Sequence, residues 1–425
     1  MPFEPALSAP APLKIAIVGA GIAGLGAAHL LARDHKVTVF EAERRLGGHA
    51  RTVLAGRAEQ VAVDTGFIVF NHLTYPRLTA LFAELGVSVK HSDMSFSANI
   101  DNGRIEYAAD SLASFFAQPK NLIDPAFIGM AGDILRFNKL ACNPANDQDV
   151  ALGDWLDVHN LGDSFRENYL LVLAGAIWSA TPRQMLAFPA ATLLNFFRNH
   201  HLLSLRNRVQ WLTVEGGSRV YVSRLEASLR RRGANIKLGA AVRRVTRGDG
   251  VSIEAEGQES ERFDAVVLAC HADQTLRLLA DPSANETCVL GALRYASARV
   301  VLHDDERHMP TRRICWSSWN VRRNGAEASV TYWMNRLQGL PTSVPLFVTL
   351  NPINAIRDNA IFDEVAFAHP IFDAAAVAAQ ARLPSLQGVR NTYFAGAYAH
   401  YGFHEDGLRS ATEAVSALAR APTWS

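Results

Sequence analysis

A short β-branched run that leads directly into three spaced glycines constrains this chain more than any other stretch. The run covers residues 14–18, and the glycines follow it with the spacing G-x-G-x-x-G. This pattern predicts a strand, a tight turn and a helix whose N-terminus faces the phosphates of a dinucleotide. The second glycine lets the backbone approach the pyrophosphate, and the third lets the helix pack on the strand. The predicted phosphate-binding residues are Gly19, Gly21, Ile22, Ala23 and Gly24.

A second predicted strand, residues 37–40, follows the helix and ends at Glu41. An acid at this distance from the glycines can accept hydrogen bonds from ribose hydroxyls, which disfavours the phosphorylated ribose of NADP. Glycine turns also serve plain packing, but the strand, the glycines and the acid together favour a nucleotide site. NAD and FAD both remain open on these residues.

The turn after this strand favours FAD. Residues 41–48, EAERRLGG, resemble the E-x-x-x-R-x-G-G sequence of flavoproteins with two dinucleotide-binding domains. In that family the arginine and the paired glycines lie near the FAD diphosphate. The alternative is a solvated turn that ends at a glycine. The resemblance implies FAD and adds these candidate contacts: Ala42, Arg45, Gly47, Gly48 and His49.

Residues 61–71 predict a strand that enters a glycine turn. They resemble the D-x-G segment that the same flavoproteins place near the isoalloxazine ring, which implies cofactor contacts for Asp64, Gly66 and Phe67. The alternative is an ordinary β-turn with Asp64 as its cap. Residues 75–86 have the apolar spacing of an amphipathic helix closed by a glycine, and we expect that helix to serve packing.

Length, charge and cysteine content narrow the class of protein. The 425 residues suit two domains with a large buried interior. A net charge of +1 gives no global field that would attract nucleic acid. The four cysteines show neither metal-ligand spacing nor a paired framework, so we expect no metal site and a cytoplasmic location. Every apolar run is far shorter than the roughly 20 residues that span a bilayer.

Residues 93–208 change to an aromatic-rich, mostly helical texture that predicts an inserted substrate domain, although aromatic residues at helical spacing usually form core. Within it, the segment Phe188 to Arg208 places leucines and phenylalanines beside Arg198, Arg206 and Arg208. Such a helix suits an anionic membrane surface, here the inner face of the plasma membrane. The alternative is a buried helix with a charged rim.

Residues 211–219 resemble the glycine-glycine turn that leads into a helix in flavin amine oxidases, and a helix is predicted over 220–232. Short strands follow at 236–238, 241–245, 251–254 and 263–269. The resemblance implies that the backbone of Val242 meets the adenine. Strand-like runs from about residue 290 to 386 predict an antiparallel sheet that completes the substrate domain.

The end of the chain carries the second motif. Residues 391–407 resemble the closing FAD motif of amine oxidases and phytoene desaturases, in which a strand, an Ala-Gly pair and an aromatic loop precede a helix that points at the flavin pyrimidine ring. A helix N-terminus stabilises negative charge there. The resemblance implies contacts from Gly396, Phe403 and His404, and the loop holds no cysteine, so we expect noncovalent FAD. The candidate catalytic residues are Tyr401, Phe403, His404 and Glu405.

Two departures from the family pattern occur in this motif. Ala397 stands where the family usually has an aspartate, and Glu405-Asp406-Gly407 stands where the family has Glu-Gly-Ala, which leaves the register after Glu405 open by one residue. The fold class predicted from all these features is α/β, with a Rossmann-like FAD-binding domain and an inserted α+β substrate domain. The predicted boundaries are a flexible tail at 1–12, an FAD-binding domain at 13–92, 209–289 and 388–425, and a substrate domain at 93–208 and 290–387.

A narrower resemblance concerns residues 64–87 and 393–410. They look like a group of bacterial flavoproteins associated with cyclopropane-fatty-acyl-synthase-like methyltransferases, which includes the desaturase of the methylated furan fatty acid pathway. This implies desaturation of a (methylated) fatty acyl chain, in phospholipid, by hydride transfer to flavin and reoxidation by oxygen. The alternatives are an amine oxidase that releases hydrogen peroxide and a nonenzymatic lipid- or nucleotide-binding scaffold.

Overall fold

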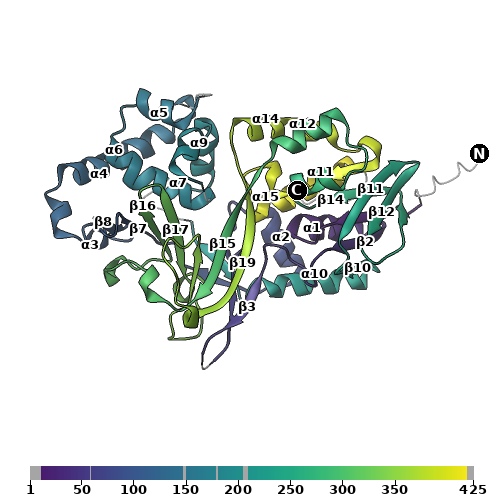
Figure 1. The fold of residues 1–425 in the computed structure, drawn as a ribbon, viewed down its shortest axis with the longest axis horizontal. Coiled ribbons are helices and arrows are strands. Elements are labelled where there is room, and N and C mark those ends of the chain that lie inside the picture. The colour runs from purple at the N-terminus through teal and green to yellow at the C-terminus, as the bar shows by residue number, and fades with distance from the viewer. Residues whose placement is uncertain (1–10, 58, 147–149, 179, 204–208, 419–425) are drawn as a thin grey trace, which may run out of the picture. The chain divides into compact units, whose positions relative to one another are not determined.

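The computed structural model describes residues 11–57, 59–146, 150–178, 180–203 and 209–418. Contacts divide the chain into two compact units. Unit 1 contains residues up to 48 together with 223–291 and those from 382 onward, and unit 2 contains 49–222 and 292–381. Each unit is therefore assembled from segments that lie far apart in the sequence (Figure 1).

Unit 1 is built on a five-stranded parallel sheet with the order β10-β2-β1-β14-β20. Its first strands and the helix that joins them are the predicted nucleotide motif. The central strands carry apolar side chains on both faces, as expected for a parallel sheet that is covered on both sides. The strands are β1 (Lys14–Val18), β2 (Lys36–Glu41), β10 (Asn235–Leu238), β14 (Ala265–Leu268) and β20 (Thr392–Phe394).

Two helices of unit 1, α1 (Ile22–Leu31) and α15 (His404–Ala417), pack against each other. Every residue of α1 is buried, as expected for a helix that is apolar all round. Glycines allow the close approach, because a Cβ on Gly26 would lie 2.4 Å from Cδ1 of Leu408. The first and last long helices of the chain thus form one layer (Figure 1).

A second, three-stranded antiparallel sheet completes unit 1, together with short helices. Arg247 on this sheet is buried and pairs with Glu286 and, at 3.0 Å, with Asp281. Arg390 also binds Asp281, at 2.5 Å, so these ion pairs join the small sheet to the turn before β20. The elements are β11 (Val242–Gly248), β12 (Gly250–Ala255), β13 (Glu261–Phe263), α11 (Ala272–Leu278) and α12 (Ala284–Ala292).

Unit 2 is built on a seven-stranded sheet with the order β19-β15-β18-β17-β16-β7-β8. All neighbouring strands are antiparallel except β16 and β7, which run parallel. The predicted antiparallel sheet after residue 290 is therefore confirmed, and two earlier strands extend it. The strands are β7 (Phe96–Ile100), β8 (Ile105–Ala108), β15 (Tyr295–His303), β16 (Trp319–Asn324), β17 (Glu327–Trp333), β18 (Phe347–Leu350) and β19 (Ile361–Pro370).

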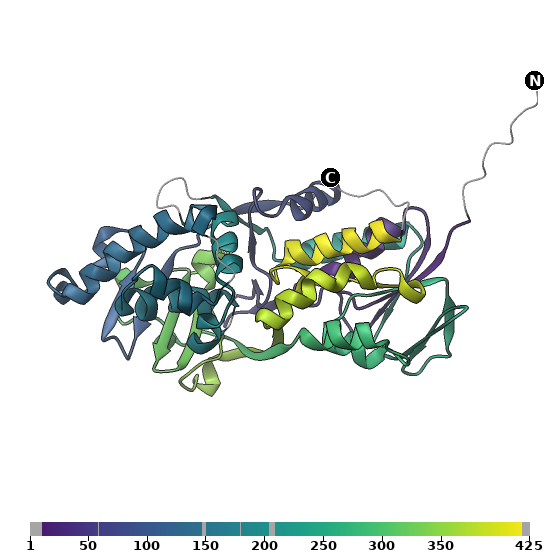
Figure 2. The same cartoon turned by 90° about the horizontal axis from the view of Figure 1, so that it is seen from above.

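A layer of helices covers one face of this sheet (Figure 2). Arg323 of β16 joins the two layers, because it donates to Oε2 of Glu167 at 2.6 Å and to Oδ1 of Asn168 at 3.4 Å. The helices are α3 (Leu112–Phe115), α4 (Pro125–Ala141), α5 (Leu152–Val158), α6 (Asp163–Phe165), α7 (Leu171–Trp178), α8 (Pro182–Leu186) and α9 (Ala190–Asn199). The insert is thus mostly helical, as predicted, but it begins with β7 and β8.

The remaining elements of unit 2 form two small sheets and further helices. The hairpin of β3 (Thr52–Ala55) and β4 (Val61–Asp64) is antiparallel, and β9 (Trp211–Val214) pairs with β5 (Val69–Phe70) and β6 (Val89–Ser92). The predicted amphipathic helix is α2 (Pro76–Leu85), which ends at the left-handed Gly86. The others are α10 (Arg219–Arg231), whose residues from 223 onward belong to unit 1, α13 (Met334–Leu337) and α14 (Ala374–Arg382).

The contact boundaries differ from the predicted domain boundaries. Residues 49–92 and 209–222 were expected in the FAD-binding domain, yet they belong to unit 2. The reason is strand pairing and packing: β5, β6 and β9 pair with one another, and the β3–β4 hairpin is joined to β19 through the ion pair between Arg51 and Asp363. Among the described residues, no helix is long and apolar enough to cross a membrane.

Candidate functional site

The ends of four strands in unit 1 lie at one edge of the parallel sheet. Val18 of β1 pairs in register with Phe40 of β2 and Leu268 of β14, and Leu268 pairs with Phe394 of β20. The segments that leave these strands include the first glycine turn, Glu41 and the Ala-Gly pair at 395–396. In open α/β sheets, ligands bind outside the carboxyl ends of the strands where the strand order reverses. Both end motifs therefore meet at the edge where this fold class places its ligand.

The first and second glycine turns are packed on each other. The N–H of Gly47 donates to the carbonyl oxygen of Ala20 at 2.9 Å, and a Cβ on Gly48 would lie 3.1 Å from Cα of Gly21. A Cβ on Gly24 would lie 1.9 Å from the carbonyl oxygen of Gly19. The space that these glycines leave is taken up by backbone of the same motif, so the two turns form one element.

Gly21 differs from its neighbours, because a Cβ built on it would meet nothing within 4 Å. It is the N-cap of α1, no side chain caps that helix, and its first turn holds no acidic residue. The first N–H groups of a helix lack partners within the helix, and its dipole favours an anion. Open space above Gly21 next to uncapped amides fits a pyrophosphate, and the predicted contacts Ile22 and Ala23 carry amides of this first turn.

Glu41 ends β2 as predicted, but its carboxylate also has a structural task. Oε2 accepts the N–H of Ala20 at 2.7 Å, and Oε1 accepts the N–H of Glu43 at 2.9 Å. Each carboxylate oxygen has two lone pairs, so both oxygens can still accept a ribose hydroxyl. The carbonyl oxygen of Glu41 accepts the N–H of Ala240 at 2.8 Å, which brings the segment leading to Val242 beside the acid.

The last motif is organised by the N-terminus of α15. The N–H of Gly396 donates to Oγ of Ser410 at 2.8 Å, which ties the end of β20 to this helix. Phe403 is the N-cap residue, and its N–H donates to Oδ2 of Asp406 at 2.9 Å. The helix begins at His404, so Glu405 and Asp406 are its second and third residues and Gly407 turns toward α1.

The first turn of α15 holds buried titratable groups. His404, Glu405 and Asp406 are each less than a tenth exposed. Burial raises the pKa of Asp406 to about 6, and Glu405 raises it as well, whereas the Phe403 N–H, His400 and Arg409 lower it. Tyr401 is half-buried in the loop before this helix. The structure thus gathers the four candidate catalytic residues, at 401 and 403–405, around one helix N-terminus of unit 1.

Four of the predicted cofactor contacts belong to unit 2. The ring of His49 stacks on Phe367 with centroids 4.6 Å apart. Phe67 meets Tyr221 edge to face, and Gly66 lies so close to residue 49 that a Cβ on it would be 2.0 Å from the carbonyl oxygen of His49. The fourth, Asp64, is buried, and its Oδ1 accepts the hydroxyls of Thr52 and Ser218.

The segment predicted to insert into a membrane is largely buried. In α9, Leu193, Leu194, Phe196 and Phe197 are at most 3% exposed, and Leu203 beyond it is 7% exposed. The ring of Phe197 packs edge to face on Phe137 of α4. The described part of this segment is therefore the buried helix with a polar rim. Its basic residues Arg206 and Arg208 lie outside the described residues.

Large apolar side chains are exposed elsewhere in unit 2. Within residues 112–135, the exposed ones are Leu112, Leu122, Ile123, Ile128 and Leu135.

Among the described residues, no group of three or more His, Cys, Asp or Glu side chains is arranged to hold a metal ion. No sequence motif includes Gln338, yet the fold brings its side-chain amide to the carboxylate of Asp64, to which it donates a hydrogen bond.

Comparisons with known proteins agree with this geometry. The family model described as "Flavin containing amine oxidoreductase" matches residues 22–308. A Mycobacterium tuberculosis protein that bears the name flavin-containing monoamine oxidase AofH is 28% identical over 280 residues, which is 60% of this chain and 56% of that protein. The L-amino-acid oxidase of Crotalus adamanteus is 57% identical over 42 residues, 10% of this chain and 8% of its own length. The match therefore spans little more than half of the first relative.

Several solved structures share the fold over nearly the whole chain. The CLA-producing fatty acid isomerase from P. acnes has a TM-score of 0.69 at 16% identity, covering 96% of this chain and 99% of its own. Cyclohexylamine oxidase from Brevibacterium oxydans IH-35A has a TM-score of 0.67 at 16% identity, covering 96% and 98%. At such low identity these likenesses show the fold alone. Because the family model matches more than half of its residues, the chain belongs to the flavin containing amine oxidoreductase family, whose cofactor is FAD.

Proposed function

We propose that this protein is an FAD-dependent oxidoreductase that desaturates a fatty acyl chain. The observation that carries the oxidoreductase part is the meeting of the two end motifs: the strand ends of β1, β2, β14 and β20 lie at one edge, and α1 and α15 pack together there. This arrangement supplies amides for a dinucleotide at one helix N-terminus and amides for a charged ring at the other.

FAD, when bound, would supply a two-electron acceptor for a hydride from one substrate carbon, while the proton on the neighbouring carbon leaves to a base or water. The protein residues bind and orient it. The first-turn amides of α1 would hold the pyrophosphate, and Glu41 would accept hydrogen bonds from the ribose. The N-terminus of α15, held by the hydrogen bond from the Phe403 N–H to Asp406, would stabilise negative charge on the ring. Phe403, the N-cap residue of α15, would supply an aromatic wall beside the ring for the reacting substrate carbon.

The substrate class rests on the resemblance of residues 64–87 and 393–410 to the flavoproteins that accompany cyclopropane-fatty-acyl-synthase-like methyltransferases. An acyl chain needs apolar surroundings, and the meeting of α7 and α9 is apolar and aromatic: the ring of Trp178 lies 4.7 Å from that of Phe196 and 5.0 Å from that of Phe188. One structural neighbour, the isomerase from P. acnes, acts on a fatty acid.

An amine is the second candidate substrate, because the curated relative from Mycobacterium tuberculosis bears the name of a monoamine oxidase. An amine oxidase would take a hydride from the carbon next to a neutral amine and release hydrogen peroxide when oxygen reoxidises the flavin. A protein that binds FAD but turns over no substrate would instead be a scaffold.

The deciding experiment mixes the purified holoenzyme anaerobically with two panels. The first contains phospholipids and free fatty acids with and without a methyl branch, and the second contains aliphatic and aromatic amines. Bleaching of the flavin absorbance by an acyl substrate, with loss of two hydrogens by mass spectrometry, is the expected result. Bleaching by amines alone, with peroxide on admission of air, assigns the protein to the amine oxidases. Absence of bleaching by every compound supports the scaffold.

Docking to an anionic membrane is a separate proposal. It concerns residues 188–208. The apolar side chains of α9 are buried and therefore cannot insert into the membrane, so docking would rest on charge alone. What supports it is the basic character of Arg198, Arg206 and Arg208 and the need to reach an acyl chain in phospholipid. Cosedimentation with vesicles of anionic phospholipid at low and high salt tests it, since electrostatic docking weakens with salt.

A further inference from the structure

Helix α4 of unit 2 has apolar side chains on two opposite faces. One face is buried, and its residues are Phe127, Met130, Ile134, Phe137 and Ala141. The other face carries Ile128 and Leu135, which are 49% and 58% exposed. Gly132 and Lys139 lie in the same row, at a spacing of three or four residues, and are exposed as well. A surface helix of a globular protein normally turns a polar face to water, so this exposed apolar row needs a reason.

The segment before α4 extends the exposed apolar row. The short helix η1 (Pro119–Leu122) ends at Leu122, which is 56% exposed, and Ile123 after it is 83% exposed. The rings of Phe115 in α3 and Phe127 in α4 lie 5.0 Å apart. Because α3 packs on the start of α4, the exposed residues of both helices belong to one region of unit 2.

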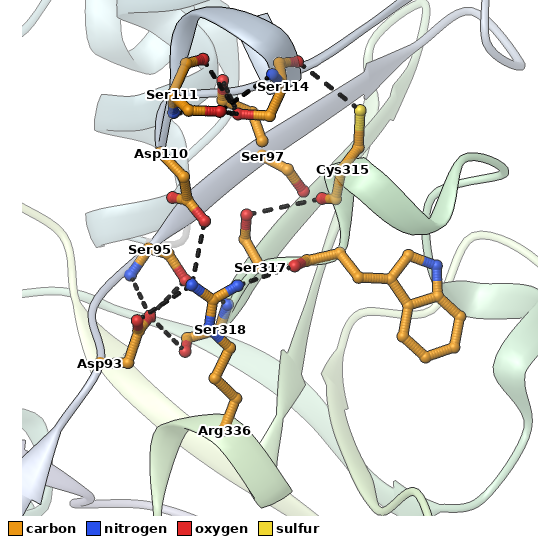
Figure 3. Close-up of polar contacts among 12 residues, drawn as sticks. Asp93, Ser95, Ser97, Asp110, Ser111, Ser114, Cys315, Ser317, Ser318 and Arg336 are labelled. Carbon is orange, nitrogen blue, oxygen red and sulfur yellow. Dashed lines mark hydrogen bonds and ion pairs between the residues drawn. The ribbon is translucent and has the colours of Figure 1, made fainter. Parts of the chain in front are cut away.

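Helix α3 is held firmly in place, as Figure 3 shows. The N–H of Ser114 donates to Oγ of Ser111 at 3.1 Å, and the N–H of Ser111 donates to Oγ of Ser114 at 3.0 Å. Asp110, directly before this cap, pairs with Arg336 of α13 at 3.0 Å. Leu112, the first residue of α3, is nevertheless 80% exposed. We call the exposed apolar residues of this region the α3–α4 surface, and they are Leu112, Leu122, Ile123, Ile128 and Leu135.

The charges around the α3–α4 surface favour an anionic partner. Between residues 111 and 141 the only acids are Asp124 and Asp133. Asp124 caps α4 with its side chain, and Asp133 pairs with Arg136 at 2.7 Å. Lys120 and Lys139 are exposed, and among the described residues neither forms an ion pair with an acid. These two ammonium groups can therefore meet negative charge from outside the protein.

The composition of the surface favours lipid over a protein partner. Its residues are all leucine or isoleucine, and none of the aromatic side chains between residues 111 and 141 is exposed. Protein interfaces are enriched in Tyr, Trp, Met and Arg and depleted in Lys, and leucines are under-represented in their hot spots. Aliphatic side chains among acyl chains, with lysines that reach the headgroups, are typical of a helix that lies in a membrane interface.

We propose that the α3–α4 surface docks on an anionic phospholipid bilayer, with its leucines and isoleucines among the acyl chains and with Lys120 and Lys139 at the headgroups. The proposal rests on the proposed function, because an enzyme that desaturates phospholipid has to reach acyl chains that stay in a membrane. It requires no membrane contact from residues 188–208. Insertion removes apolar side chains from water, which is the favourable term that this surface offers.

The test measures how the purified holoenzyme partitions onto vesicles of phosphatidylglycerol and phosphatidylcholine, by cosedimentation. Ile123→Glu places a charge at the most exposed residue of the surface. It should weaken partitioning roughly 10- to 100-fold, which corresponds to the transfer of one aliphatic side chain. Leu73→Glu is the matched control, because Leu73 also belongs to unit 2, is 59% exposed and lies outside the α3–α4 surface. This control should partition as wild type does.

Lys139→Gln tests the charge of the surface separately. Loss of one lysine near an anionic membrane should weaken partitioning roughly 5-fold. On vesicles of phosphatidylcholine alone, this variant should behave as wild type does. Lys36→Gln removes the same charge from an exposed position on β2 of unit 1, and it should leave partitioning onto both kinds of vesicle unchanged. All four positions are exposed, so we expect the variants to fold, and equal Tm values check this.

Each outcome bears on the proposal. Wild type that stays in the supernatant, or equal partitioning of Ile123→Glu and Leu73→Glu, would overturn it. A dimer in light scattering that Ile123→Glu dissociates would also overturn it, because a second copy of the chain would then cover the surface. Vesicle binding that depends on Ile123 and Lys139 supports the docking surface. If phospholipid then fails to bleach the flavin, the proposed substrate is wrong while the docking surface stands.

Discussion

Gly407 of α15 lies against Ile22 of α1, so that a Cβ on Gly407 would come within 2.8 Å of the Cγ2 atom of Ile22 and 3.8 Å of the backbone nitrogen of Ala23. Ile22 belongs to the first glycine motif and Gly407 to the last. Because Gly407 has no side chain, the N-terminal turns of α1 and α15, which come from opposite ends of the chain, can pack directly against each other in unit 1. This contact joins the two halves of the proposed FAD site.

We expect Gly407→Ala to destabilise the protein, because the added methyl must push aside a β-branched side chain held within a helix. Overpacking of this kind costs about 1 to 3 kcal/mol of the free energy of unfolding. Gly129→Ala in α4 is the control, since a Cβ there meets nothing within 4 Å and replacing a helical glycine gains about 0.5 to 1 kcal/mol. Urea unfolding of both variants measures the difference. A neutral Gly407→Ala would show that α1 and α15 pack more loosely.

Two neighbouring glycines should separate cofactor binding from folding. Gly21 has φ −73° and ψ −175°, which other residues adopt, and a Cβ there meets nothing. Gly21→Ala should therefore keep the wild-type Tm of the apoprotein while lowering FAD content, because the methyl occupies the space needed by the pyrophosphate. Gly24→Ala should fail to fold stably, since its Cβ would lie 1.9 Å from the carbonyl oxygen of Gly19. Full FAD content in Gly21→Ala would place the phosphates elsewhere.

Asp406 should give the protein a pH-dependent stability. Its pKa is raised to about 6 in the folded protein, so the protonated form favours folding. The stabilisation is complete below the unfolded pKa of about 4 and is lost as the pH rises through 6, by about 3 kcal/mol in total. Asp406→Asn keeps an oxygen for the Phe403 N–H but does not titrate.

The measurement is the free energy of unfolding of wild type and Asp406→Asn between pH 4 and 8. Wild type should lose stability relative to the variant as the pH rises through this range. Asp64, whose pKa is also raised, is present in both proteins and cancels in the difference. A difference that stays constant with pH would mean that Asp406 remains ionised in the fold.

Phe403→Ala should keep FAD bound and slow the reduction of the flavin by substrate. The backbone N–H that binds Asp406 survives the change, so α15 stays capped, and the loss falls on the aromatic wall. A misplaced reacting carbon lowers the rate by roughly 10- to 100-fold. Stopped-flow reduction and the FAD-to-protein ratio distinguish the two effects. Loss of FAD itself would show that the matching of Phe403 to the flavin-facing position of related enzymes is wrong.

Local sequence determined the nucleotide-binding elements. The strands β1 and β2 and the helix α1 follow from side-chain periodicity and from local glycines such as Gly24, whose missing side chain leaves room for the backbone of Gly19 in the same turn. The end of α2 at Gly86 has the same origin, because a left-handed residue favours glycine. Such features depend on neighbours along the chain, and the sequence displays those neighbours directly.

Only the tertiary structure decided which surface each element covers. The leucines and phenylalanines of α9 have the same spacing whether a helix lies on a membrane or inside a protein, and contacts with Phe137 and Trp178 place them inside. Gln338 and Asp64 likewise show no pattern that links them, since they meet through the packing of distant strands. An amphipathic period specifies that one face is buried, but the partner of that face depends on residues from elsewhere in the chain.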